Sequence, residues 1–464
     1  MASEAKIASV DRSREAMDTE DNFSDGPRKP SKWRQCSIVV AAFMLNFSGC
    51  GLLFSFGIYQ SLYEDLSREP GNPFTGASSA EITLIGSIAA SLMKLGAPYV
   101  VAWTKYFKPE PVIYAGGLLY GIGSVLASFG TALWHFQLAQ GVLIGIATCL
   151  AYMPSMVVPP SWFGRHRAFC LGIISAGTGI GGLVWSPVLT LCIRELGFRN
   201  TLRLTGCLNT ALICISGYAL AWEPQMAASL RESNAELSWA TALFKVPLPP
   251  KSLVFTRKFL AQAINAFFQS AAYYTPVFYI AAYSKTLGYG DADGANFTAL
   301  SNACNAIGKI GVGFIADRIG RLDSFFLTTL LSCVSTAGLW VSSTVAPDLD
   351  RGRALFVAFT VMYGLFASAY VGLFSPALVE LFGMANMTHI TAVMYMLQGA
   401  AGLVGTPVAG VLVSGSSTPD SYLYMAVAVG ILMFISAISV QWARIELMRE
   451  QAEGRWKWKW KWGL

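Results

Sequence analysis

About twelve apolar stretches of roughly 20 residues run through the chain, separated by shorter polar segments. A helix needs about 20 apolar residues to cross a hydrocarbon core of roughly 30 Å, so stretches of this length predict membrane-spanning helices. The composition agrees, because 54% of the 464 residues are hydrophobic, 13% are charged and the mean hydropathy is +0.49. The sequence therefore predicts an all-α polytopic membrane protein.

The predicted spans form two groups of six on either side of a polar, proline-bearing segment. They are 36–63, 80–103, 109–130, 133–157, 168–192 and 202–221 in the first group, and 257–284, 295–316, 322–344, 354–380, 389–413 and 422–442 in the second. We expect two pseudo-symmetric six-helix bundles over 36–221 and 257–443, joined by a cytosolic linker over 222–256. Residues 1–35, expected to be disordered, and 444–464 are predicted cytosolic tails.

The basic residues predict the orientation of the chain in the membrane. Alternating the loops between the two sides assigns about 24 of the 33 Lys and Arg residues to one side and about 7 to the other. Since cytoplasmic loops carry the excess of Lys and Arg, both termini are expected in the cytosol, with the plasma membrane as the predicted location.

Two lysines, Lys94 and Lys309, lie deep inside predicted spans, and each is followed two positions later by a glycine. A cation near the bilayer centre costs roughly 2.5 to 3.5 kcal/mol on insertion scales and is normally retained for an ion or substrate pathway. Two such cations indicate an anionic cargo. The alternative is that each ammonium reaches the membrane interface or bonds the carbonyls of a neighbouring helix.

The two halves repeat each other in sequence. GLVWSP at residues 182–187 recurs as GLVGTP at 402–407, and Lys94 and Lys309 are separated by a similar offset of about 215 residues. Each lysine therefore occupies the corresponding point of the second helix in its half. Repeats of this kind in carriers place the substrate site near the bilayer midplane, between halves that rock against each other.

Several polar side chains are expected to line the central cavity with these lysines. Asn305 precedes Lys309 by four residues and so shares its helix face. The other candidates are Tyr152, Tyr273, Tyr274, Tyr370, Tyr395 and Gln398. Together they suit a carboxylate-bearing, partly apolar molecule, although each tyrosine alone is better explained by ordinary helix packing.

Gating residues are expected in the loops on the cytosolic side. In the run IADRIGR, Asp317 can pair with Arg318 or Arg321 and so form a latch between two helices, the alternative being a solvated turn that sets orientation. Arg165 and Arg167, in the loop before the fifth span, are further gating candidates.

No catalytic or metal-binding pattern is present in the sequence. The nine cysteines lie in or at the ends of apolar spans without a CxxC pair, and the three histidines lack metal-ligand spacing. GTGIGG at residues 177–182 lies inside an apolar helix without a preceding strand, which argues against nucleotide binding. We expect no enzyme activity, no cofactor, no metal and no nucleic-acid partner.

Several separated motifs resemble the monocarboxylate porter family of the major facilitator superfamily, in its fungal form. They include SWFGRHRAFCLGIISAGTGIGGLVWSP, GIYQSLYEDL, GKIGVGFIADRIGR and SPALVELFG. The resemblance implies the major facilitator fold with 12 transmembrane helices and transport of carboxylates by alternating access, often with a coupled proton. It also places Lys309 where relatives commonly carry arginine, and Asn305 where mammalian members carry an acid.

The sequence thus predicts a secondary active transporter of an organic anion, a monocarboxylate or a carboxylate-bearing metabolite, in the lipid bilayer. Lys94 and Lys309 would bind the charge, and a proton is the candidate coupled ion. The first alternative is an efflux carrier for a secondary metabolite of a biosynthetic gene cluster. The second is a sensor on the same scaffold that does not transport.

Overall fold

The computed structural model describes residues 31–163, 167–234, 238–244, 249–383, 387–413 and 418–461. Nearly every residue in these ranges is helical, and none of them lies in a strand. Residues Ile38–Leu464 form one compact unit, in which the two sequence halves pack together. Met1–Ser37 form a second unit, of which residues 31–37 are described. The predicted all-α architecture is confirmed.

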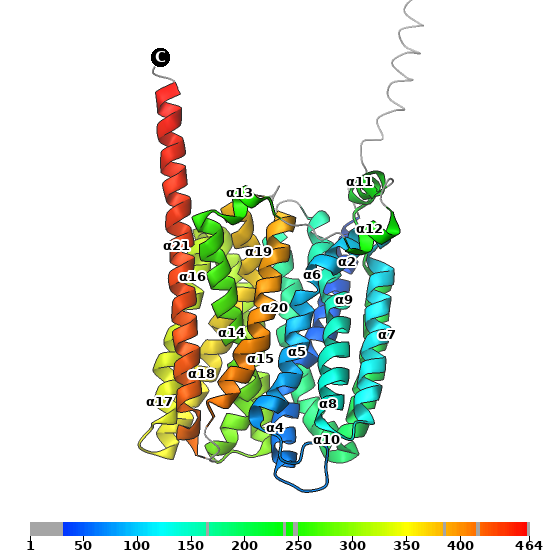
Figure 1. The fold of residues 1–464 in the computed structure, drawn as a ribbon, viewed down its shortest axis with the longest axis vertical. Coiled ribbons are helices and arrows are strands. Elements are labelled where there is room, and N and C mark those ends of the chain that lie inside the picture. Colours follow the sequence, from blue (N-terminus) through cyan, green and yellow to red (C-terminus); the bar gives the residue numbers. More distant parts are fainter. Residues whose placement is uncertain are drawn as a thin grey trace, which may run out of the picture. The chain divides into compact units, whose positions relative to one another are not determined.

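The first half supplies helices that run side by side (Figure 1). Its elements are α2 (Lys32–Leu45), η2 (Asn46–Cys50), α3 (Gly51–Phe54), α4 (Phe56–Ser67), α5 (Ser79–Leu95), α6 (Ala97–Phe107), α7 (Pro109–Ser128), α8 (Leu133–Phe136), η3 (Gln137–Leu143), α9 (Ile144–Val157), η4 (Pro159–Ser161) and α10 (Arg167–Ala219).

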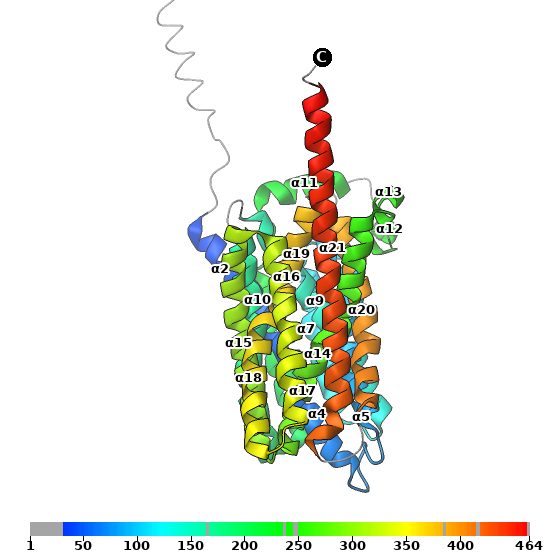
Figure 2. The same cartoon turned by 90° about the vertical axis from the view of Figure 1, so that its left-hand side faces the viewer.

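Short helices of the predicted linker connect this half to the second, whose helices run in the same general direction (Figure 2). The linker helices are α11 (Pro224–Asn234), α12 (Trp239–Phe244) and α13 (Lys251–Val254). The second half comprises α14 (Arg257–Thr286), α15 (Asp291–Ile319), α16 (Arg321–Val334), η5 (Ser335–Trp340), α17 (Val341–Thr344), α18 (Leu349–Ala367), α19 (Ala369–Phe382), α20 (Met387–Val411), η7 (Pro419–Tyr422) and α21 (Leu423–Lys461).

The helices end at two opposite faces of the larger unit. The linker end carries α11, α12 and α13, together with the last residues of α15 and the first of α16 (Figure 1). The far end carries the loop between α4 and α5 and the junction between α14 and α15 (Figure 1). The linker end and the far end are thus the two opposite ends of the helices.

The long element α10 is two helices that meet at Gly197. This residue has a φ of 75° and a ψ of 158°, which is a left-handed backbone conformation that glycine adopts without the steric cost of a Cβ. The break falls between the predicted spans 168–192 and 202–221. A single glycine therefore turns the chain around between two of the predicted helices.

Eight of the described helical runs are long and apolar enough to cross a membrane, and the bent pair α5 and α6, at 48° to each other, is a ninth candidate. α14 and α15 are of comparable length, 30 and 29 residues. They are less apolar than these eight runs, since they carry polar side chains such as Gln262, Asn265 and Gln269 on α14. The predicted total of twelve spans and the domain boundaries remain predictions.

The two halves meet along paired helices. α10 packs along α15, α5 packs along α20, and α4 packs against α14. Glycine permits the close approach of α10 and α15, because a Cβ at Gly179 would lie 2.6 Å from the carbonyl oxygen of Asn302. Helices in this contact position the two predicted lysines, which lie on α5 and α15.

Candidate functional site

Lys94 and Lys309 are both buried where the two halves meet. Their exposed fractions are 4% and 2%. Among the described residues, neither ammonium forms an ion pair with a carboxylate. The closest groups to each nitrogen are hydroxyls, a carbonyl oxygen and aromatic rings. Both lysines are thus held inside the protein without a neutralising acid.

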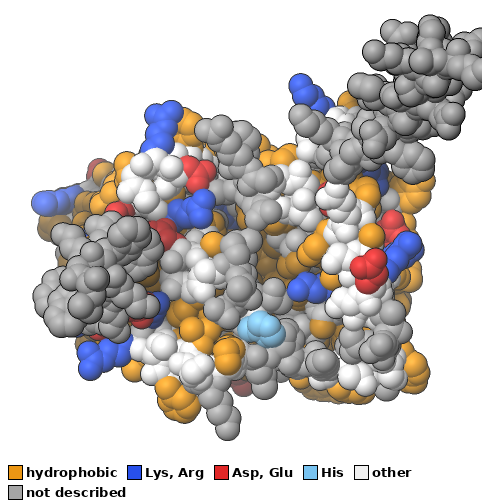
Figure 3. Space-filling view, turned by 90° about the horizontal axis from the view of Figure 1, so that it is seen from above, with side chains coloured by type: hydrophobic (Ala, Val, Ile, Leu, Met, Phe, Trp, Pro, Cys, Tyr) orange, Lys and Arg blue, Asp and Glu red, His pale blue; other side chains and the backbone are white. Residues whose placement is uncertain are grey.

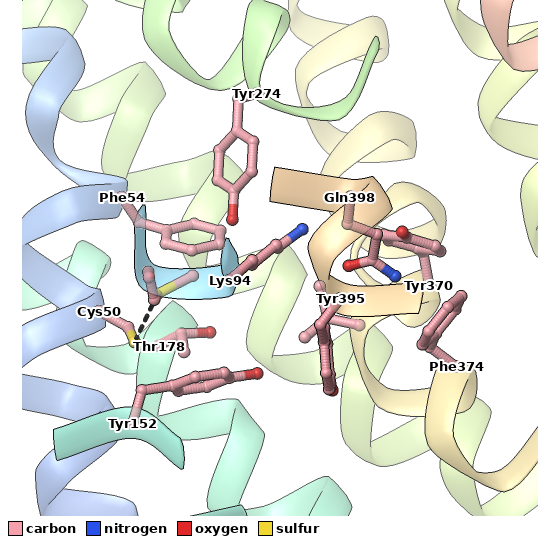
Figure 4. A pocket seen from close by; sticks show the side chains of 12 residues that line it. Cys50, Phe54, Lys94, Tyr152, Thr178, Tyr274, Tyr370, Phe374, Tyr395 and Gln398 are labelled. Carbon is pink, nitrogen blue, oxygen red and sulfur yellow. Dashed lines mark hydrogen bonds between the residues drawn. The ribbon is translucent and has the colours of Figure 1, made fainter. Parts of the chain in front are cut away.

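Lys94 lies in a small central cavity between the two halves. Aromatic side chains from both halves form most of its wall, and Figure 4 shows the ammonium pointing into the space between Tyr274 and Gln398. The lining residues are Cys50, Phe54, Met93, Lys94, Tyr152, Thr178, Tyr274, Tyr370, Val371, Phe374, Tyr395 and Gln398.

The Lys94 ammonium has few partners of its own. It donates one hydrogen bond, to the Ser270 hydroxyl at 3.3 Å, and Ser270 in turn donates to the carbonyl of Gln398 at 2.8 Å. The nitrogen also lies 5.2 Å from the ring centroid of Tyr274 and 5.8 Å from that of Tyr370. Ring faces attract a cation, but they supply no full negative charge.

Two more hydrogen-bond donors in this cavity lack a partner. The Tyr370 hydroxyl and the Gln398 side-chain nitrogen are buried, and neither bonds another group in the described part of the chain. Buried polar groups are nearly always hydrogen-bonded, because an unmet donor costs about 1–3 kcal/mol. An ammonium with spare donors beside it is a suitable receptor for an oxygen-rich anion.

Lys309 has a different environment. Its ammonium donates to the carbonyl of Ser175, at 3.2 Å, and to the Thr178 hydroxyl, both on α10 of the other half. The nitrogen also lies 5.4 Å from the ring centroid of Phe54. The contact with Ser175 is the one expected if the lysine bonds the carbonyls of a neighbouring helix.

A second small cavity extends from Lys309 toward the linker end. Asp317 and Arg321 line it together with Gly172, Val312, Gly313, Ala316, Ala369, Gly372, Leu373 and Pro376. The described wall of the Lys94 cavity does not include Lys309. The two lysines therefore face different spaces, with Thr178 between them.

Asn305 and Tyr273 lie beside the Lys94 cavity and not on its described wall. The Asn305 amide donates to the Tyr273 hydroxyl at 3.3 Å. Tyr273 packs against Tyr274 and Tyr370, at centroid distances of 5.1 and 6.1 Å. These two predicted residues thus support the wall, whereas Lys94, Tyr152, Tyr274, Tyr370, Tyr395 and Gln398 form it.

The described gating candidates Asp317, Arg318 and Arg321 lie at the linker end, where basic side chains are spread over the surface (Figure 3). Arg321 pairs with Asp317 at 3.6 Å across the break between α15 and α16. Arg318 instead stacks on the Phe314 ring at 4.2 Å. Arg165 lies outside the described residues, and α10 begins at Arg167, whose side chain is not described.

The far end has its own contacts between the halves. Lys285 of α14 forms an ion pair with Asp65 of α4 and a second with Asp291, at 2.9 Å. Farther from this end, between the same two helices, the rings of Phe56 and Phe278 meet edge to face with centroids 5.3 Å apart. The far end is therefore held shut by an ion pair and an aromatic contact that the sequence analysis does not anticipate.

The sequence analysis also misses half of the Lys94 cavity wall. Cys50, Phe54, Met93, Val371 and Phe374 are apolar residues inside apolar helices, and no local pattern distinguishes them from packing residues. Thr178 lies within the GTGIGG run, where its hydroxyl is a detectable polar signal. No group of three metal-ligating side chains occurs among the described residues.

The chain is similar to known proteins over most of its length. Residues 37–349 match the family model described as Major Facilitator Superfamily. A protein from Gibberella moniliformis named "MFS-type transporter" is 25% identical over 92% of this chain and 93% of that protein. The "Agnestins efflux protein AgnL12" of Paecilomyces divaricatus is 24% identical over 89% of this chain and 88% of that protein.

Mammalian and bacterial proteins are also similar. "Monocarboxylate transporter 11" of Homo sapiens is 26% identical over 81% of this chain and 76% of that protein. A crystal structure of a D-xylose-proton symporter aligns with a TM-score of 0.66 and 15% identity, covering 87% of this chain and 96% of that one. At that identity the structural match shows the fold alone.

Proposed function

The chain belongs to the Major Facilitator Superfamily, and from this premise we propose that it is a secondary active carrier that moves an organic anion across a membrane by alternating access. Membership places it among transporters and not among enzymes. The cargo is a monocarboxylate or a larger carboxylate-bearing metabolite, whose charge Lys94 binds in the central cavity.

The observation that carries this proposal is the environment of the Lys94 ammonium. It is buried, it lies at the contact between the halves, and it has one hydrogen bond and no carboxylate within ion-pair distance among the described residues. Leaving a charge buried without a partner costs several kcal/mol, so the binding of an anion beside Lys94 is favourable. Tyr370 and Gln398 supply further donors for the carboxylate oxygens.

The rest of the cavity suits an organic molecule better than a small inorganic ion. Phe54, Tyr274 and Phe374 offer ring surfaces around the ammonium. Aromatic and apolar walls with a few placed polar groups are typical of small-molecule sites. We therefore expect the carboxylate to bind at Lys94 while the apolar part of the cargo contacts the rings.

Alternating access gives Lys309 a part in the cycle. Its bonds to Ser175 and Thr178 join α15 to α10 across the two halves. When the halves separate at the linker end, these bonds break, and the ammonium becomes available along the second cavity. Lys309 thus bonds the two halves to each other in this state. It contacts the anion only while the anion passes between the central cavity and the linker end.

The direction of transport has two candidates, uptake and efflux. The relative named an efflux protein supports efflux, and the relatives named monocarboxylate transporters support a monocarboxylate cargo in either direction. The excess of Lys and Arg on the linker side favours a cytosolic location for that side and for both termini. The proposed location is the plasma membrane.

The test is transport by the full chain reconstituted in proteoliposomes. Radiolabelled lactate and benzoate serve as carboxylate probes, and glucose serves as a neutral probe. We expect saturable exchange of at least one carboxylate and none of glucose. At probe concentrations near the wild-type KM, Lys94→Met should lose most of that exchange, whereas Lys105→Met, a control on the adjoining helix α6, should retain it.

Two results would contradict the proposal. One is exchange of glucose at a rate equal to that of the carboxylates. The other is full carboxylate exchange by a folded Lys94→Met protein, because the charge that we assign to cargo binding would then be dispensable.

A further inference from the structure

A ring of hydrogen bonds joins the two halves at the far end. Gln60 donates to a Glu64 carboxyl oxygen at 2.6 Å and to the Thr83 hydroxyl at 2.7 Å. The Ser79 hydroxyl lies 2.5 Å from the same Glu64 oxygen and 3.1 Å from the Tyr279 hydroxyl. Tyr279 also lies 2.5 Å from the Thr83 hydroxyl, which closes the ring. Tyr279 belongs to α14, and the other four residues belong to α4 and α5.

The hydroxyl protons of this ring can be counted. Thr83 also contacts the backbone carbonyl of Ser79, at 2.7 Å, so four contacts in the network need a proton that Gln60 does not supply. Ser79, Thr83 and Tyr279 each carry one such proton. With Glu64 ionised, three protons serve four contacts, and one pair of oxygens faces each other without a hydrogen between them.

A proton on Glu64 removes this deficit. Glu64 then donates to Ser79, Ser79 to Tyr279, Tyr279 to Thr83, and Thr83 to the backbone carbonyl, while Gln60 keeps both of its bonds. Every hydroxyl in the ring donates once. We propose that Glu64 is a proton-binding site and that the far end closes fully only when this carboxyl group is protonated.

The nearby charges leave Glu64 without a cation of its own. Lys285, the nearest ammonium on α14, is already paired with Asp65 and Asp291. The other titratable neighbours of Glu64 are Asp65, Tyr279 and Tyr422, and Arg68, at the end of α4, lies near Tyr422.

The nearest approach from α20 comes at Gly410, where a Cβ would lie 2.7 Å from the Tyr279 hydroxyl. Since glycine has no ionisable group, α20 adds no charge at that point. A bound proton is therefore the simplest way for this carboxyl group to enter a closed, partly buried contact.

The ring links proton binding to the movement of the halves. Opening the far end withdraws Tyr279 from Ser79 and Thr83, which removes the partners that favour the protonated form. The proton is then released to the solvent at that end. Resting on the proposed function, this site makes a proton the coupled ion of anion transport, although Asn305 replaces the acid that mammalian relatives carry on the eighth span.

Hydrogen–deuterium exchange of the purified full-length protein tests the site without any substrate. The readout is exchange in peptides that cover the far-end loop, residues 68–78, at pH 5.5 and pH 8. Because a ligand that prefers the closed form stabilises it, the wild type should close more at pH 5.5 and open more at pH 8. Glu64→Gln keeps a permanent donor toward Ser79, and the Gln60 amide can turn its unbonded oxygen toward the new amide nitrogen, so this variant should stay closed at both values.

The predicted result is equal exchange by wild type and Glu64→Gln at pH 5.5, and exchange about tenfold faster in the wild type at pH 8. Comparing the proteins at one pH cancels the intrinsic effect of pH on amide exchange. Glu69→Gln, an acid in the same loop whose side chain is outside the ring, should behave as wild type. Identical exchange by wild type and Glu64→Gln at both pH values would overturn the proposal.

A second variant keeps the test decisive if Glu64→Gln does not fold. Ser79→Ala removes the link between Glu64 and Tyr279, so its far-end exchange should be faster than that of wild type at pH 5.5 and equal to it at pH 8. Retention of the wild-type pH dependence by Ser79→Ala also contradicts the proposal.

A transport experiment separates the two proposals. In proteoliposomes, an inward proton gradient should drive benzoate accumulation by wild type, while Glu64→Gln should retain benzoate exchange and lose the gradient-driven part. Loss of exchange in the wild type would count against the proposed function. Gradient-driven accumulation by Glu64→Gln would count against the proton site.

Discussion

The two buried lysines occupy related positions and have contrasting partners. Lys309 is bonded to a carbonyl and a hydroxyl of α10, across the halves. Lys94 faces an aromatic cavity and makes one hydrogen bond, at 3.3 Å. A bonded cation must break its hydrogen bonds before it can bind a ligand, whereas a cation with unused donors binds a ligand without that cost.

The internal repeat sharpens this contrast. Residues 182–187 match 402–407 with an offset of 220 residues, so Thr178 corresponds to Gln398. Thr178 accepts a bond from Lys309, while the Gln398 side-chain nitrogen has no partner in the described chain and lines the Lys94 cavity. The same pair of positions forms a closed tie in one half and an open receptor in the other.

The largest expected effect is that of Lys94→Met, which keeps the length of the side chain and removes its charge. Losing a hydrogen bond to a charged group costs about 1.5–3 kcal/mol, so the KM for a carboxylate probe should rise by about 10- to 100-fold. Exchange kinetics in proteoliposomes measure it, with Lys105→Met as the matched control. A KM within twofold of wild type would remove Lys94 from the site.

Lys309→Met should act mainly on turnover. The variant breaks the bonds between α15 and α10 that form in one state of the cycle, and we expect a loss of about 5- to 20-fold in kcat with little change in KM. Lys309→Arg should recover part of the rate. Should the KM rise as far as in Lys94→Met, the two lysines would share one role and the contrast would fail.

Gln398→Leu tests the unused donor beside Lys94. A neutral hydrogen bond contributes about 0.5–1.5 kcal/mol, which predicts a rise in KM of about 2- to 10-fold. The effect should disappear in the Lys94→Met background if both groups hold the same carboxylate. Fully additive effects in the double variant would instead indicate separate roles.

The smallest effect is expected from Thr178→Val, which preserves the shape of the side chain and removes one acceptor of Lys309. The Ser175 carbonyl remains as a partner, so the turnover should fall by only about 2- to 5-fold. The KM for the carboxylate should be unchanged. A larger loss than that of Lys309→Met would show that the hydroxyl acts on something other than this lysine.

Much of this arrangement follows from sequence, because periodic apolar runs and isolated charges are strong local signals. The runs place the helices, the repeat pairs Lys94 with Lys309, and the rarity of cations in apolar helices marks both as buried. Helix partners are harder to derive. That Lys309 meets α10 while Lys94 meets an open cavity depends on how the helices pack, which no local pattern contains.

The far-end contacts show the same limit. Glu81 and Glu380 are acids at the ends of predicted spans, yet Glu81 caps its own helix by bonding Ser78 and Glu380 is exposed. Glu64 and Asp65 look like ordinary residues at a helix end. Only their proximity to Tyr279 and Lys285 of the other half identifies them as part of a closure.

The most direct test of the central claim pairs a charge on the ligand with the charge on Lys94. Dissociation constants of benzoate and its neutral amide are measured for wild type, Lys94→Met and Lys309→Met. We predict that wild type and Lys309→Met prefer benzoate by at least about tenfold and that Lys94→Met has no preference. A preference for benzoate that survives in Lys94→Met would contradict the account.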